Sequence, residues 1–120
     1  MQSDTYLSFY LSTSRIQIFR STLREIGNPK FIRFLVKEDG QSMIMEAYHK
    51  KDFRSHRVPK PTDNKEWKME VRSLPLCTLL QNKLNWTDGR SYRIPGKVYP
   101  QQRLAVFDLS AAEQIQQAGT

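Results

Sequence analysis

The residues best suited to chemistry in this sequence are cations concentrated in one short stretch. Residues 49–60 read HKKDFRSHRVPK and contain five Lys or Arg, one acid and the ring of Phe53. Lysine and arginine attract phosphate chains, acidic proteins and anionic membrane surfaces, and an aromatic ring among them can stack on a nucleic-acid base. The stretch therefore indicates a surface that binds a polyanion. The structural alternative is a solvated loop whose charge only aids solubility.

The excess of positive charge extends beyond this stretch. The net charge is +7, and residues 15–60 hold 11 Lys or Arg against 5 Asp or Glu, whereas residues 104–120 hold two acids and no base. Binders of single-stranded nucleic acid use cations to follow the phosphates and rings to stack on the bases. We therefore predict nucleic-acid contacts from these side chains: Arg15, Arg20, Arg24, Arg33, Lys37, Lys50, Lys51, Phe53, Arg54, Arg57 and Lys60.

Other reactive side chains give weaker signals. His49 and His56 share their basic stretch with a single acid, Asp52, so they lack the further ligands that zinc requires. Cys77 follows a leucine in a leucine-rich segment, which is typical of a small buried side chain. The sequence matches no Walker loop, GxGxxG, GxSxG or HExxH motif. We predict no catalytic residue, no metal and no cofactor, and an enzyme built from unremarkable residues stays open as an alternative.

Strands must position most of these cations. Alternation of apolar and polar residues, bounded by turn residues, predicts strands at 6–11, 15–20, 30–38, 41–48, 56–58, 66–72, 91–94 and 102–109. The dipeptide Asp39-Gly40 predicts a hairpin between the third and the fourth. Pro95-Gly96 is expected to end the seventh.

Three helical segments are expected. Thr22 and Glu25 have the spacing of a capping box, so one or two helical turns should begin there and end before Gly27. Ser73 can cap an amphipathic helix over residues 74–86. Ser110 to Glu113 has capping-box spacing too, which predicts a short C-terminal helix to about Ala118.

These elements predict one domain over residues 1–120. Its class should be α+β, with a mostly antiparallel sheet of about six to eight short strands, one amphipathic helix (about 74–86) and a short C-terminal helix, because the links are too short for parallel crossovers. No apolar run approaches a membrane span of ~20 residues, no secretory signal is present, and there is one cysteine. We therefore expect a cytoplasmic protein without a membrane partner.

The stretch STLREIGNPKFIRFLV, residues 21–36, is followed by the predicted hairpin. It resembles small uncharacterised bacterial proteins. Over residues 21–48 it is also similar to the AbrB-type swapped hairpin, where a short helix ending in Leu-Gly precedes a strand, a turn and a returning strand. The resemblance implies a dimer that binds DNA through basic residues, with Arg15, Arg20 and Arg24 as the DNA-facing cations.

Together these features lead to a non-enzymatic basic binding module that contacts nucleic acid or acts as a regulator. The alternative is a protein-interaction or assembly module that binds an acidic partner or self-associates through an edge strand. A homodimer is open in both cases.

Overall fold

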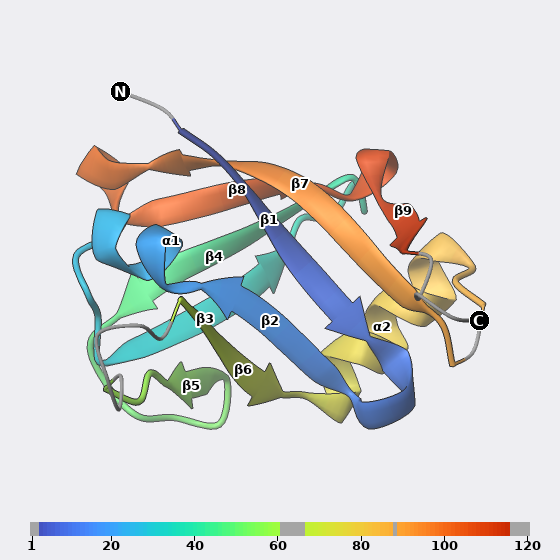
Figure 1. Ribbon diagram of the computed structural model, residues 1–120, viewed down its shortest axis with the longest axis horizontal. Coiled ribbons are helices and arrows are strands. Elements are labelled where there is room, and N and C mark those ends of the chain that lie inside the picture. The colour runs from blue at the N-terminus through green and yellow to red at the C-terminus, as the bar shows by residue number, and fades with distance from the viewer. Residues whose placement is uncertain (1–2, 61–66, 88, 116–120) are drawn as a thin grey trace.

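Eight antiparallel strands form a nearly closed barrel in the computed structural model, which describes residues 3–60, 67–87 and 89–115 (Figure 1). The strands are β1 (Ser3–Tyr10), β2 (Arg15–Phe19), β3 (Phe31–Val36), β4 (Ser42–Tyr48), β5 (Ser55–Arg57), β6 (Lys68–Arg72), β7 (Ser91–Tyr99) and β8 (Leu104–Asp108). Their order around the barrel is β5-β3-β4-β8-β7-β1-β2-β6, and β9 (Glu113–Ile115) pairs with β7 outside this path. The barrel is therefore interrupted between β5 and β6.

Helical structure is scarce in this barrel. One helix of any length is described, α2 (Leu74–Leu84), together with the six-residue α1 (Arg20–Glu25). Three short 3-10 turns complete the described elements: η1 (Leu11–Thr13), η2 (Pro100–Gln102) and η3 (Leu109–Ala111). The predicted α+β class is wrong, because the strands pair around a barrel and bury their apolar faces mainly against one another.

The predicted C-terminal helix is wrong over its described part. The side chain of Asp108 accepts a hydrogen bond from the backbone N–H of Ser110 at 3.0 Å, and η3 follows in place of an α-helix. Residues Glu113–Ile115 then extend along the start of β7, where Arg93 forms an ion pair of 3.0 Å with Glu113. A free stretch of sheet edge thus outcompetes a short helix. The last residues of the predicted helix, 116–118, lie outside the described part of the chain.

Strand β7 continues through Pro95 and Gly96, where the sequence predicts a break. On one side β7 pairs with β9 over residues 91–93 and with β8 over residues 96–99, so Pro95 lies between the two ladders and no ladder needs its missing N–H. Gly96 is required by close packing, because a Cβ there would lie 2.4 Å from Cδ1 of Phe107. Both residues therefore fit inside a strand.

Helix α2 covers one end of the barrel, at the right of Figure 1. It begins as predicted, since the Ser73 hydroxyl accepts a hydrogen bond from the Leu76 N–H at 3.3 Å. It ends two residues earlier than predicted, at Leu84, because Asn85 adopts a left-handed conformation with φ 54°. Trp86 then turns inward and stacks on Tyr92, with ring centroids 4.5 Å apart.

The core forms from alternate residues of the strands, as the sequence pattern predicts. Its largest fully buried side chains are Phe9, Phe107, Leu7, Ile16, Ile18, Leu23, Ile26, Ile32, Met43, Met45, Leu80 and Ile94. Each such burial stabilises the fold by about 1.5–3 kcal/mol before chain entropy is counted. Trp67, predicted to point inward, is instead 59% exposed and stacks on Phe19 just before β6 begins.

Candidate functional site

A cleft of about 1130 Å³ opens beside α1 and β5, at the left of Figure 1. Its walls come from the end of α1, the segment leading into β3, and the segment that carries β5. The described lining residues are Arg20, Arg24, Asn28, Pro29, Lys30, Phe31, Lys51, Asp52, Ser55, Arg57, Val58, Pro59 and Lys60. Six of these are Lys or Arg, and Asp52 is the one acid among them. The cleft is therefore strongly cationic over its described surface.

Helix α1 brings two of the cations to the cleft. Arg20 and Arg24 are four residues apart, which places them on one side of a helix. The predicted capping box is not used, because the Thr22 hydroxyl instead hydrogen-bonds the Thr5 hydroxyl at 2.6 Å inside the barrel. This bond, with buried Leu23, fixes which side of α1 faces the core and which faces the cleft.

Arg20 joins the two walls of the cleft. Its side chain is only 5% exposed, and Nη1 donates a hydrogen bond of 2.7 Å to the carbonyl oxygen of Pro59. On the second wall, the backbone N–H of Val58 donates to the carbonyl of Lys30 at 2.9 Å. These bonds connect α1 and the start of β3 to the segment after β5, so the cleft has a fixed shape.

A tight turn forms the rim of the cleft. The Asp52 carboxylate accepts a hydrogen bond from the Arg54 N–H at 2.8 Å, and the Asp52 N–H donates to the Ser55 hydroxyl at 2.9 Å. The Arg54 N–H holds the pKa of Asp52 below its usual range, so this carboxylate is ionised at neutral pH. Its negative charge is therefore structural in origin and opposes anions in the cleft.

Five of the predicted site residues line this one cleft: Arg20, Arg24, Lys51, Arg57 and Lys60. Lys30 also lines it and was missed, because the sequence presents it only as the first residue of a predicted strand. The signal that could have found it is its position directly after Asn28-Pro29, a turn that also carries cleft residues. The convergence itself depends on long-range contacts between α1 and residues 51–60.

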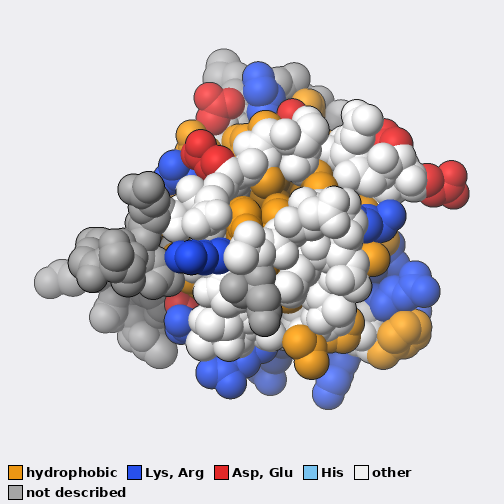
Figure 2. Space-filling model, turned by 90° about the vertical axis from the view of Figure 1, so that its right-hand side faces the viewer, with side chains coloured by type: hydrophobic (Ala, Val, Ile, Leu, Met, Phe, Trp, Pro, Cys, Tyr) orange, Lys and Arg blue, Asp and Glu red, His pale blue; other side chains and the backbone are white. Residues whose placement is uncertain are grey.

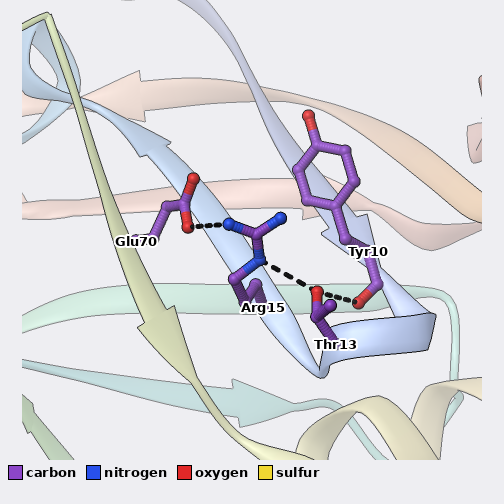
Figure 3. A network of polar contacts seen from close by, with 4 residues as sticks. All are labelled: Tyr10, Thr13, Arg15 and Glu70. Atoms are coloured by element: carbon purple, nitrogen blue, oxygen red, sulfur yellow. Dashed lines mark hydrogen bonds and ion pairs between the residues drawn. The ribbon is translucent and has the colours of Figure 1, made fainter.

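Arg15 lies elsewhere, in the turn between β1 and β2 (Figure 3). Its Nη1 forms an ion pair with Glu70 at 2.8 Å, and its Nε donates to the Thr13 hydroxyl at 2.9 Å. The Thr13 hydroxyl in turn donates to the carbonyl of Tyr10 at 3.4 Å. Arg15 therefore stabilises a hairpin and has its charge largely offset by Glu70.

Arg33 is also engaged within the sheet. It lies opposite Glu46 in the β3–β4 ladder and forms an ion pair with that carboxylate, while its guanidinium lies 4.3 Å from the centre of the Tyr48 ring. The hydrogen bond to Glu46 raises the pKa of Arg33 above its usual value. This cation is therefore committed to a cross-strand cluster.

The remaining predicted residues are exposed but do not line the cleft. Lys37 follows β3 and Lys50 follows β4. Phe53 is 91% exposed at the rim turn, with the Arg54 guanidinium 5.2 Å from its ring centre. Both rim residues directly adjoin lining residues in the chain.

The histidines and the cysteine occupy structural positions. The His56 ring packs edge-on against Phe34 at 5.6 Å, and burial lowers its pKa. Burial raises the pKa of the Cys77 thiol to about 11, which keeps it protonated at neutral pH. Within residues 3–60, 67–87 and 89–115, no three His, Cys, Asp or Glu side chains gather as metal ligands would. No helix in this part of the chain is long and apolar enough to cross a membrane.

Comparison with known proteins adds no further assignment, since no protein family, no curated protein and no solved structure matches this chain. The similarity of residues 21–48 to the AbrB-type hairpin thus stays a prediction. The site is therefore interpreted from its own geometry and charge.

Proposed function

We propose that this protein is a nucleic-acid-binding module whose cationic cleft holds a phosphate backbone. The observation that carries the proposal is the convergence of six Lys or Arg side chains, with one acid, on the described surface of a single cleft. Phosphates bring one negative charge per nucleotide, and cations that neutralise them gain affinity by releasing counterions.

The shape of the cleft favours a chain over a small anion. Its volume of about 1130 Å³ exceeds the roughly 300–1,000 Å³ of typical small-molecule sites. Cations also approach it from both walls, with Arg24 and Lys30 on one and Lys51, Arg57 and Lys60 on the other. A ligand with several phosphates in sequence would contact both walls at once.

The proposal predicts that reversing two charges of one wall abolishes most binding. In Lys51→Glu/Arg57→Glu, oligonucleotide affinity should fall at least ~10-fold at 50 mM salt, and the salt slope should shrink by about two contacts. Fluorescence anisotropy with labelled oligonucleotides at 50 and 200 mM salt measures both quantities. Both side chains are exposed, so the fold should tolerate the change.

The matched control is Lys83→Glu/Lys97→Glu, which changes the net charge equally at exposed positions of α2 and β7. It should leave affinity within ~2-fold, since long-range charge effects are screened at a Debye length of about 10 Å. Equal losses in both double variants would contradict a localised site. Absence of oligonucleotide binding by the wild type at 50 mM salt would overturn the proposal.

A second candidate function is assembly through an edge strand. Among the described residues, β5 pairs only with β3 and β6 only with β2, so each leaves one side without a partner strand. Such edges can accept a strand from another chain. Binding of polyglutamate without binding of oligonucleotides, or a dimeric mass in light scattering that outlasts high salt, would favour this function over the first.

A further inference from the structure

The rim turn presents an aromatic ring to solvent on a fixed backbone. Phe53 is 91% exposed, although burying such a ring is favourable. The backbone on both sides of it is fixed, because Arg54 donates to the Asp52 carboxylate at 2.8 Å and Ser55 donates to the Asp52 carbonyl at 3.2 Å. The ring is therefore held outward by its turn.

The same turn belongs to the wall of the cleft. Lys51, Asp52 and Ser55 line the cleft, so the Cα atom of Phe53 is about 3.8 Å from that of a lining residue. The Arg54 guanidinium lies 5.2 Å from the ring centre and adds a further positive charge beside it. A ring, a neighbouring cation and a cationic cleft thus occur in one short segment.

This juxtaposition distinguishes an unpaired strand from a duplex. An unpaired strand exposes the faces of its bases next to its phosphates, and a ring beside a cationic groove can stack on one of them. In a duplex the bases stack on each other, and a ring gains access only by unstacking them at a cost. The longest described helix, α2, carries Lys83 as its single cation, which makes it a poor reader of a major groove.

We infer that the ligand is an unpaired nucleic-acid strand, with consecutive phosphates in the cleft and one base stacked on Phe53. This inference rests on the proposed function. It makes the cleft the source of the salt-dependent affinity, whereas Phe53 supplies a contribution that does not depend on salt.

The test compares Phe53→Ala with the wild type on single-stranded oligonucleotides of about 12 nucleotides, within the roughly 4–16 that one binding fold covers. Affinity should fall roughly 5- to 150-fold, as expected for loss of one stacking ring, while the salt slope stays unchanged. Phe53→Trp should restore the affinity. A 2-aminopurine base in the oligonucleotide should be quenched by the wild type and not by Phe53→Ala.

The matched control is Tyr6→Ala. Tyr6 is a 41% exposed ring on β1 with the Arg93 guanidinium 5.0 Å from its centre, and it does not line the cleft. Its removal should leave oligonucleotide affinity unchanged. A loss equal to that of Phe53→Ala would overturn the inference.

The outcomes separate the inference from the proposed function. If the wild type binds single strands and duplexes equally and Phe53→Ala binds like the wild type, the stacking inference is wrong while the cleft still binds phosphate. If the wild type binds neither ligand at 50 mM salt, the proposed function itself fails. Preference for the single strand, lost in Phe53→Ala, supports both.

Discussion

The two ends of the barrel treat charge and apolar surface in opposite ways. At the α2 end, Arg15 and Arg93 are paired with Glu70 and Glu113, and Trp86 is buried against Tyr92. Figure 2 shows this end, where hydrophobic side chains lie between uncharged groups and backbone. At the cleft end, six cations share the described surface with one acid, and Phe53 is exposed.

This contrast separates stability from binding. Paired charges and buried rings lower the free energy of the fold and leave little for a ligand to contact. Clustered cations repel one another, so the cleft end gains free energy when an anion arrives. We therefore expect substitutions at the α2 end to change stability and substitutions at the cleft end to change affinity.

The largest effect on stability is expected from Leu80→Ala. Leu80 is fully buried between α2 and the barrel, so its truncation should lower the free energy of unfolding by about 2–5 kcal/mol. Urea denaturation measures this change. The neighbouring Leu79 is 40% exposed, and Leu79→Ala should cost less than about 1 kcal/mol. If the two variants lost equal stability, α2 would not cover the core as described.

A smaller effect, on affinity, is expected from Asp52→Asn. The asparagine oxygen can still accept the Arg54 N–H, so the turn persists while the negative charge leaves the cleft. Oligonucleotide affinity should rise roughly 2- to 5-fold, because a nearby unit charge in water is worth up to about 1 kcal/mol.

The pH dependence of this effect follows from the lowered pKa of Asp52. The wild-type carboxylate is charged from neutral pH down to below its usual pKa, so the gain should be constant between about pH 5 and 8 and vanish only in stronger acid. Equal affinities of Asp52→Asn and the wild type at pH 7 would contradict the repulsion. Anisotropy titrations at several pH values measure it.

The smallest effect is expected from Glu70→Gln. The Arg15–Glu70 pair is partly exposed, with 38% and 32% of the two side chains accessible, so its loss should cost about 0.2–1 kcal/mol and less at high salt. Oligonucleotide affinity should not change, since the pair lies in the β1–β2 turn outside the cleft. A gain of affinity on freeing Arg15 would show that this hairpin also binds, and would erase the contrast between the ends.

Much of the barrel could be predicted because its strands are local patterns. The alternation through Met43 and Met45 correctly predicted which face of β4 is buried, and Asp39-Gly40 predicted its hairpin. Ser73 likewise predicted the first residue of α2. In each case the sequence signal and the tertiary contacts favour the same structure.

The errors occur where a distant segment decides the outcome. Ser110 to Glu113 has the spacing of a helix start, yet an open edge of β7 draws Glu113 into a strand. Pro95 ends most strands, yet it lies between two ladders of β7. The α+β class failed for the same reason, since closure of a barrel depends on pairings between strands far apart in the chain.

The candidate site shows the same division. A dense basic stretch at residues 49–60 indicated a binding segment, and several of its cations do line the cleft. That Arg20 and Arg24 join them, and that Arg15 and Arg33 do not, depends on where α1 packs and on which carboxylates lie across the sheet. A single sequence contains no local signal for either.

The pairing of β1 with β7 also sets when the protein can fold during its synthesis. Residues 3–10 pair along their whole length with residues 91–99, near the other end of the barrel sequence. At 5–20 residues per second, the ribosome needs roughly 5 to 18 seconds after making β1 to complete β7. Until then β1 has only its hairpin partner β2, so its apolar face is exposed. Barrel closure is therefore a late event on the nascent chain, and such long-range pairing makes it intrinsically slow.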